Sequence, residues 1–229
     1  MRRVDSWRRK TRSNPIRSNP IQSKANLTHP NYPRGLQATP HPIRSTDPIP
    51  PNPTMSRFFL NETWYFITVA TNRHFPFFFY EREKRIIVDK IISSAKKLGI
   101  EKFYFGVMSN HYHLLAYFKD GSIIPKLMNL IQGGSSFLLM RDLGNKDRNT
   151  WGDYHLNIPK DEASFDRIKG YVIGNPIKHK EVKNFDELLN YPFSSFGQVV
   201  REDGREQAEA IVCSVIETPE ERMAGFFRG

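Results

Sequence analysis

The sequence predicts an α+β fold: a ferredoxin-like (RRM-like) antiparallel sheet with helices on one face and an open face for a ligand. Two observations carry this prediction. Between residues 64 and 143 the predicted elements come in the order strand, helix, strand, strand, helix, which is how such a sandwich begins. Two histidines, His111 and His113, stand one residue apart in the third predicted strand, where they would share the open face.

The first half of this pattern follows from residue periodicity. Residues 64–71 are β-branched and aromatic, which is typical of a strand. In residues 80–98 apolar side chains recur at helical spacing, and Gly99 is a suitable C-terminal stop. Residues 101–108 and 110–118 then predict two strands, which are antiparallel if the turn lies between them.

The second helix is less regular. It is predicted to begin near Ser122, with Pro125 in its first turn. Gly133 and Gly134 should interrupt or bend it before its last turns. A further short strand is expected around residues 151–158.

A third helix is predicted from Ser164, a good N-cap residue, to Asn175. Pro176 disfavours α conformation in the residue before it, and Gly174 loosens the same place, so the helix should end or kink there. Tyr171 and Asn175 are four residues apart and therefore share one helix face. Two interpretations stay open: a packing tyrosine with a C-cap asparagine, or a pair of functional groups.

Composition divides the chain of 229 residues into three parts. Residues 1–54 hold ten of the sixteen prolines and a net charge of +8, against +2 for the rest, so we expect a disordered basic extension. Residues 55–200 carry the apolar pattern of a single domain, and Met55 is a candidate start of translation. Residues 201–229 are predicted to be a tail with one short helix and no assigned chemistry.

The same counts indicate the compartment. Cys213 is the single cysteine, which excludes an intrachain disulfide. No apolar run approaches the roughly 18 residues of a membrane span, and the arginine-rich start lacks the apolar segment of a signal peptide. We therefore expect a cytoplasmic protein without a membrane partner.

His111 and His113 are candidate metal ligands. Side chains alternate between the faces of a strand, so the two imidazoles project from one face, roughly 6.5–7 Å apart at the backbone, and can chelate one ion. Tyr112 and its apolar neighbours fall on the opposite face, where they can pack on a core. The alternative is a pair of half-buried histidines satisfied by hydrogen bonds, and the spacing alone does not decide.

Four segments, taken together, resemble the single-tyrosine HUH transposases, most closely the REP-associated tyrosine transposase branch. They are Asn110-His-Tyr-His113, Trp151-Gly-Asp-Tyr-His155, Tyr171-Val-Ile-Gly-Asn-Pro-Ile-Lys178 and Tyr191-Pro-Phe-Ser-Ser-Phe196. They occur in the order typical of that family, and the resemblance covers about residues 57–198. The sequence departs from the family pattern at Ser109, where proline is usual, and at Gly174, where a larger residue is common.

This resemblance implies an HUH endonuclease-type fold and a metal-dependent transposase that cleaves and rejoins single-stranded DNA at hairpin-flanked sites. The implied nucleophile is Tyr171, which would form a 5′-phosphotyrosine intermediate. His111, His113 and Asn175 would hold a divalent metal ion, Mg²⁺ or Mn²⁺. The implied partner is a single-stranded DNA hairpin, bound by a monomer or a homodimer.

DNA recognition is expected from exposed aromatic side chains, which stack on bases, and from cations, which hold the phosphate backbone. The candidate basic residues are Lys126, Arg141, Lys169, Lys178 and Lys180. His155 lies near the site in the family layout, where it could orient DNA, move a proton or have a structural role.

Two other functions stay open. A catalytically silent module that binds single-stranded nucleic acid would stack bases on Phe103, Tyr104 and Phe105. A metal-dependent phosphohydrolase would use water as the nucleophile and form no covalent adduct. Tyr154 is a rival nucleophile, ranked below Tyr171 because it has no asparagine one helical turn away.

Overall fold

A four-stranded antiparallel sheet forms the centre of the computed structural model, which describes residues 59–143 and 150–216. The strand order is β2-β3-β1-β4, and every pairing is antiparallel. The strands are β1 (Thr63–Thr71), β2 (Phe103–Val107), β3 (His111–Phe118) and β4 (Trp151–Asn157). The predicted α+β class and all four strands are therefore confirmed. The predictions for residues 1–54 lie outside the described residues.

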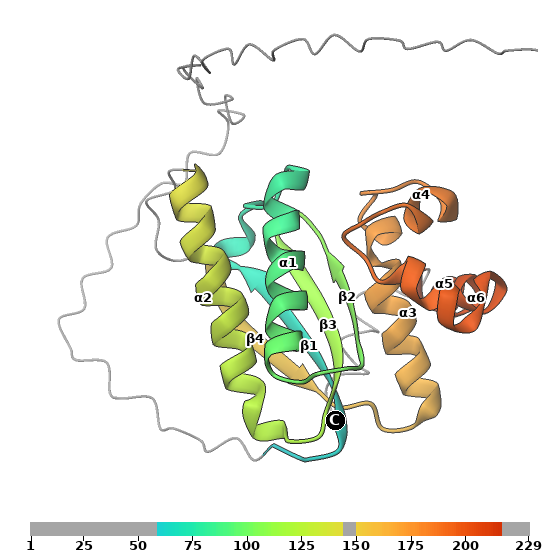
Figure 1. The fold of residues 1–229 in the computed structure, drawn as a ribbon. Helices are drawn as coiled ribbons and strands as arrows, with labels where there is room; N and C mark the ends of the chain where they lie inside the picture. Colours follow the sequence, from blue (N-terminus) through green and yellow to red (C-terminus); the bar gives the residue numbers. More distant parts are fainter. Residues whose placement is uncertain (1–58, 144–149, 217–229) are drawn as a thin grey trace, which may run out of the picture. The chain divides into compact units, whose positions relative to one another are not determined.

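Two long helices cover one face of the sheet, as Figure 1 shows: α1 (Glu81–Lys97) and α2 (Ile124–Leu143). Short 3-10 turns, η1 (Asn72–His74) and η2 (Gly121–Ile123), precede them. Alternate residues of β1 pack under these helices because successive strand side chains point to opposite faces. Those residues are Tyr65, Ile67 and Val69, and each is buried in the same core as Tyr112 of β3.

Of the predicted interruption or bend of α2, the interruption is wrong, because the helix runs continuously through Gly133 and Gly134. Apolar residues on both sides of the two glycines stay on the side of the helix that faces the core. Leu127, Ile131 and Leu139 are all buried there. Their burial outweighs the roughly 1 kcal/mol by which each glycine disfavours a helix interior.

The opposite face is partly covered, which differs from the open face that we expected. Helix α3 (Glu162–Lys178) packs against β2 and β3 there, and α6 (Arg205–Ile216) packs on α3. Phe66 and Leu115 of the sheet join Val172 of α3 and Val212 of α6 in a second apolar core. On β4, by contrast, Asp153 and His155 stay exposed on this face. The uncovered part of the face thus lies beside α3, toward β4.

Both predicted ends of α3 are wrong by a short distance. Asp161 is the N-cap, and its carboxylate accepts a hydrogen bond from the backbone N–H of Ser164. The Ser164 hydroxyl in turn accepts one from the backbone N–H of Asp161, which completes a capping box. At the other end the helix continues through Pro176 to Lys178. Pro176 lacks the N–H that would bond to the carbonyl of Val172, so burial of this turn maintains the helix there.

The last helices complete the second core. They are α4 (Phe185–Leu189), α5 (Phe196–Asp203) and α6. The predicted boundary at residue 200 falls inside α5, and α6 packs closely on α3 at two glycines. A Cβ built at Gly170 would lie 2.2 Å from the carbonyl oxygen of Ile211, and one at Gly174 would lie 2.5 Å from Val212 Cγ1. Gly174 therefore permits helix contact, where we had expected it to loosen the chain.

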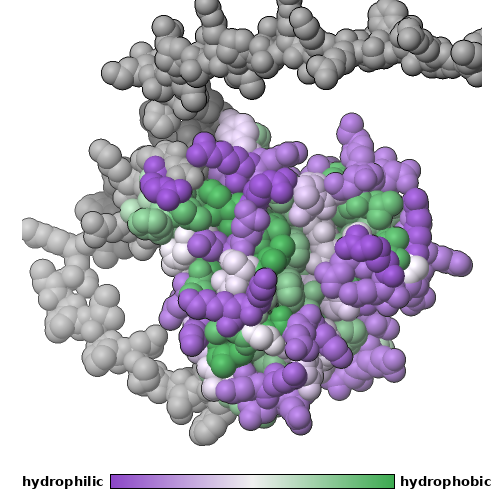
Figure 2. Space-filling view, viewed as in Figure 1, coloured by the Kyte–Doolittle hydropathy of each residue, from purple (hydrophilic) through white to green (hydrophobic). Residues whose placement is uncertain are grey.

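Hydrophilic side chains dominate the side of the domain seen in Figure 2, with hydrophobic ones showing in the gaps between elements. This view is the one in which α1 lies in front of the sheet. The histidine face is on the other side of the sheet, beneath α3. No helix among the described residues has the length and apolar character needed to cross a membrane.

Candidate active site

One row of residues crosses the sheet at the level of the second histidine. The register pairs Gly106 of β2 with His113 of β3, His113 with Thr68 of β1, and Thr68 with His155 of β4. Directly paired residues point to the same side of a sheet, so all four face α3 and the uncovered part of this face. The row therefore runs from a glycine beneath the helix to an exposed histidine at the sheet edge.

His111 and His113 lie close together, as strand alternation predicts. Their ring centroids are 5.0 Å apart, with the ring planes at 73°. His113 is buried and stacks on Phe66, while His111 is partly exposed. Two imidazoles from one strand thus reach the same point beneath α3.

Hydrogen bonds at Nδ1 orient both rings. His111 Nδ1 lies 2.7 Å from Asn110 Oδ1. Because Asn110 Nδ2 donates to the backbone carbonyl of His74, its oxygen faces the imidazole, so His111 Nδ1 carries the proton. His113 Nδ1 lies 3.1 Å from Thr68 Oγ1, which can accept a hydrogen bond from it. When the proton is on Nδ1, the Nε2 of each ring keeps the lone pair that a metal ligand needs.

Both histidines are held neutral. Burial is the main cause, and it lowers the pKa of His111 from its usual 6.5 to about 3, with His179 and His74 as lesser causes. Burial, followed by the charges of His111, His179 and Lys178, also places the pKa of His113 well below its usual value. Only a neutral imidazole can bind a metal ion, so at neutral pH the pair is in its ligand form.

Helix α3 brings Tyr171 and Asn175 against the histidines. The Tyr171 ring centroid lies 5.0 Å from that of His113, and 6.2 Å from that of Phe66. Lys178 Nζ lies 5.0 Å from the centroid of the Tyr171 ring. The four residues that the sequence singled out, two from β3 and two from α3, therefore meet in one place.

Asn175 and His113 supply orphaned polar atoms of the kind that a metal ion would satisfy. Asn175 is 1% exposed, and neither its Oδ1 nor its Nδ2 has a hydrogen-bond partner that meets normal geometry. The same holds for His113 Nε2. Buried polar atoms without partners are unusual and call for an explanation. Two imidazole nitrogens and one amide oxygen suit a divalent ion that also keeps positions open for water and phosphate.

This donor set depends on the amide. Within the described ranges, no three His, Cys, Asp or Glu side chains are grouped so as to hold a metal ion. The Asn175 side chain lies close to His111, and this proximity slightly raises the pKa of His111 against the larger effect of burial. Mg²⁺ and Mn²⁺ are hard cations that prefer oxygen ligands to sulfur ligands, so the amide oxygen of Asn175 suits them.

Gly106 lets α3 approach the sheet closely enough to form the site. A Cβ built on Gly106 would lie 2.3 Å from the carbonyl oxygen of Val172 and 3.9 Å from Asn175 Cβ. That carbonyl is the one that Pro176 leaves without a helical N–H partner. The glycine in the strand and the proline in the helix thus act together to set the height of Asn175 above the sheet.

Replacing Gly106 by alanine is therefore expected to lower the free energy of unfolding by about 1–3 kcal/mol and to weaken the site, because the new methyl group pushes α3 away. Gly133→Ala is the matched control. A Cβ there meets nothing within 4 Å, and alanine favours a helix interior, so stability should rise by about 0.5–1 kcal/mol. Urea unfolding of both variants checks this, and equal stabilities would contradict it.

The predicted DNA-contacting residues fall into two groups. Lys169 is a correction, because it is buried, pairs with Asp203 at 2.5 Å and lies 4.6 Å above the Tyr104 ring. A cation held in this way fixes α3 to α5 and is not available to a phosphate. The other candidates are at least partly exposed: Lys126, Arg141, His155, Lys178 and Lys180.

Sequence reasoning missed residues that lie around the histidines. His179, the C-cap of α3, is exposed, and its ring centroid lies 4.8 Å from that of His111. Thr68 and Asn110 orient the imidazoles. Asn110 could have been found as the polar residue preceding the histidine pair, but the strand pairing that brings Thr68 into place leaves no local signal.

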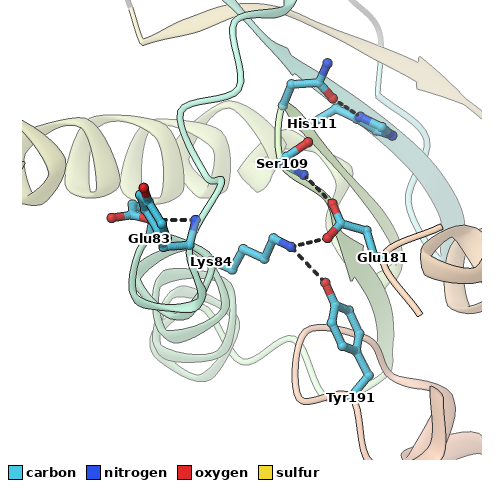
Figure 3. A network of polar contacts seen from close by, with 8 residues as sticks. Glu83, Lys84, Ser109, His111, Glu181 and Tyr191 are labelled. Atoms are coloured by element: carbon cyan, nitrogen blue, oxygen red, sulfur yellow. Dashed lines mark hydrogen bonds and ion pairs between the residues drawn. The ribbon is translucent and has the colours of Figure 1, made fainter. Parts of the chain in front are cut away.

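A polar network secures the start of the histidine strand (Figure 3). Glu181 accepts a hydrogen bond from the backbone N–H of Ser109 at 3.1 Å and forms an ion pair with Lys84. Lys84 also donates to the Tyr191 hydroxyl at 3.1 Å. Burial, together with the negative charge of Glu181, raises the pKa of Tyr191, so its hydroxyl stays protonated.

The rival site residues lie elsewhere. Tyr154 pairs with Val69 and packs against the core under α1 and α2, on the face away from the histidines. Phe103 and Phe105 belong to the same core, so they offer no open stacking surface. Tyr104 stacks on Trp64 with ring centroids 5.9 Å apart. The expected base-stacking strand of an RNA-binding module is thus occupied by internal packing.

Comparison with known proteins gives matches for both sequence and fold. A family model described as "Transposase IS200 like" matches residues 60–175, about half of the chain. A solved structure described as that of a REP-associated tyrosine transposase bound to a REP hairpin is 20% identical, with a TM-score of 0.53, and covers 65% of this chain and 86% of that chain. At this identity the likeness concerns the fold alone.

A putative transposase from Deinococcus radiodurans R1 is 19% identical over 50% of this chain and 92% of that chain, with a TM-score of 0.38. No match was found among curated proteins.

Proposed function

The chain belongs to the IS200-like transposase family, and from this premise we propose that it cleaves and rejoins single-stranded DNA with Tyr171 as the nucleophile. The observation that carries the proposal is the meeting of four side chains from two distant segments. Tyr171 lies against His113, whose Nε2 is buried without a partner, and Asn175 is buried beside them with both amide atoms unsatisfied. Structural roles alone would leave these orphaned atoms unexplained.

The reaction that we propose transfers a phosphoryl group to the Tyr171 oxygen. That oxygen forms a bond to phosphorus as the bond from phosphorus to the 3′-oxygen of the upstream nucleotide breaks. The tyrosine loses its proton, the 3′-oxygen gains one, and the products are a 5′-phosphotyrosine and a free 3′-hydroxyl. The phosphotyrosine retains the energy of the phosphodiester, so attack by another 3′-hydroxyl rejoins DNA without ATP.

His111, His113 and Asn175 would hold a divalent ion, Mg²⁺ or Mn²⁺. When bound, such an ion supplies positive charge to a non-bridging oxygen of the scissile phosphate. The residues of the chain do the rest of the positioning. Asn110 and Thr68 keep both imidazoles in their ligand tautomers, and packing of α3 through Gly106 keeps Tyr171 within reach.

Single-stranded DNA would approach over the uncovered part of the sheet, between α3 and β4. His155 is exposed on this face, and Lys178 lies over the Tyr171 ring, so both border the proposed path. We propose a DNA hairpin with a single-stranded flank as the substrate, in line with the REP hairpin bound by the structurally similar transposase. Because one chain brings Tyr171 beside its own His113, a monomer can suffice for cleavage.

The function is tested with the full chain, Mn²⁺ and single-stranded DNA that includes hairpins from the regions flanking its own gene. Each strand is labelled at either the 5′ or the 3′ end and run on a denaturing gel. Label from the 3′ end should move with the protein, while label from the 5′ end should appear on a shorter free strand. Peptide mass spectrometry should then find the nucleotide on Tyr171.

Other outcomes would favour the rival functions. Two free DNA fragments with no protein-linked label would indicate a phosphohydrolase that uses water. Retarded but intact strands would indicate a silent binding module. Either result, obtained with the whole panel of flanking hairpins, would contradict the transposition chemistry proposed above.

The basic residues should differ in their effect on DNA affinity. Lys178→Ala is expected to reduce the slope of log K against log salt by about 1, because one phosphate contact is lost. Lys169→Met should leave that slope unchanged but lower the free energy of unfolding by about 1–2 kcal/mol, since it removes a largely buried ion-pair partner. Fluorescence anisotropy at several salt concentrations measures the slope, and a reversed order of the two variants would contradict the assignment.

A further inference from the structure

Glu181 contacts both parts of the candidate site (Figure 3). It follows α3, the helix that carries Tyr171, by three residues. Its Oε1 accepts a hydrogen bond at 3.1 Å from the N–H of Ser109, which stands two residues before the first histidine. Its Oε2 forms an ion pair with Lys84 of α1. One carboxylate therefore joins the end of the tyrosine helix, the turn before the histidine strand, and the helix on the opposite face.

The backbone holds Glu181 firmly against the last turn of α3. The N–H groups of Glu181 and Val182 both donate to the carbonyl of Pro176, at 2.9 and 3.3 Å. Lys180 adopts a left-handed conformation, with φ of 59°, and so turns the chain back toward the helix. This turn follows directly after Asn175. If Glu181 is displaced, the turn is therefore displaced with it.

Lys84 occupies an unfavourable place that its partners stabilise. It is only 4% exposed and lies in the first turns of α1, where the helix dipole disfavours a cation. Tyr191 accepts a hydrogen bond from its ammonium group, which also lies 5.9 Å from the ring centroid of Phe193. Glu181 is the one carboxylate that pairs with it in the described contacts. Burial of this pair keeps both side chains in a single arrangement.

We propose that Glu181 is a positioning residue, whose carboxylate fixes the histidine strand and the tyrosine helix relative to each other. Lys84 holds the carboxylate, and the carboxylate holds the Ser109 N–H. The inference rests on the proposed function, because it assigns these contacts to placing His111 and Asn175 for a shared metal ion. It goes beyond that function in giving a role to a residue that is neither one of the proposed metal ligands nor one of the basic residues proposed to contact DNA.

Three changes separate this role from that of a simple stabilising ion pair. Glu181→Ala removes both contacts of the carboxylate. Glu181→Gln keeps an amide oxygen that can accept from the Ser109 N–H but loses the charge of the ion pair, and it is the matched control. The double exchange of Lys84→Glu with Glu181→Lys restores opposite charges, but lysine has no acceptor for the Ser109 N–H.

Two readouts are measured on the full chain well below its unfolding temperature. Hydrogen–deuterium exchange of residues 109–113 and 171–178, measured without metal, reports how firmly the backbone of these two segments is held. The affinity for Mn²⁺, measured from the electron paramagnetic resonance of the free ion, reports how well the ligands converge. We expect faster exchange in both segments and at least about tenfold weaker Mn²⁺ binding for the double exchange and for Glu181→Ala, with Glu181→Gln close to wild type in both readouts.

The double exchange decides between the two roles. It should recover much of the unfolding temperature lost in Glu181→Ala without recovering slow exchange or Mn²⁺ affinity. Recovery of all three would overturn the proposal, because an ion pair alone would then be sufficient. A wild-type protein that binds no Mn²⁺ would contradict the metal site and the proposed function, and the exchange measurement would still decide the role of Glu181.

Discussion

Replacing Tyr171 by phenylalanine is expected to abolish the covalent DNA–protein adduct and to slow strand cleavage by at least about a thousandfold. The substitution removes one oxygen and keeps the ring. That ring contacts His113 and Phe66, and Lys178 lies above it, so the packing of α3 should persist. The loss of adduct and cleavage would therefore result from removal of the nucleophile and not from a change in the fold.

Tyr154→Phe is the matched control for this substitution. Tyr154 is the rival nucleophile, but it packs toward α1 and α2 on the face of the sheet away from the histidines. The control variant should form the adduct at the wild-type rate. Both variants are compared on denaturing gels with end-labelled DNA, and thermal unfolding verifies that they fold. Adduct formation by Tyr171→Phe would exclude Tyr171 as the nucleophile.

Replacing His113 by alanine is expected to lower Mn²⁺ affinity and strand cleavage by about a hundredfold or more. His113 is buried, is held by Thr68 at Nδ1, and directs an unpartnered Nε2 toward the site. Its removal leaves one imidazole and one amide, which is too few donors for firm binding of a divalent ion. DNA binding through the basic residues should be affected much less.

His155→Ala provides the comparison, because His155 lies in the same row of the sheet but is exposed at its edge. This variant should bind Mn²⁺ as tightly as wild type and lose only part of its affinity for DNA. Titration calorimetry with Mn²⁺ and anisotropy with DNA separate the two effects. If His113→Ala kept full Mn²⁺ affinity, the two histidines would have to be reassigned as structural residues.

Local periodicity was sufficient to predict the strands and the principal helices. Residues 64–71 read as a strand from β-branched and aromatic composition, and the strand is Thr63–Thr71. The errors arose where a tertiary contact outweighed a local signal. Gly133 and Gly134 do not break α2, because burial of neighbouring apolar residues holds the helix. Pro176 does not end α3, because that turn is packed against the sheet and α6.

The same distinction applies to the site. Strand alternation places His111 and His113 on the same face of their strand, and helical spacing places Tyr171 and Asn175 on the same face of their helix. Each pair could therefore be predicted from a few consecutive residues. Lys169 was misassigned for the opposite reason. Its partner, Asp203, lies 34 residues away in the sequence, and nothing local marks the pair.

The sequence by itself determined the chemistry that each segment carries: two imidazoles on a strand, and a tyrosine and an amide one turn apart on a helix. Only the tertiary structure decided that these pairs meet, and at what distance. Gly106 admits the Val172 carbonyl, Gly174 admits Val212, and Glu181 reaches Ser109. Such contacts depend on the packing of segments far apart in the chain, whereas the periodicities of strands and helices depend only on the nearest neighbours of each residue.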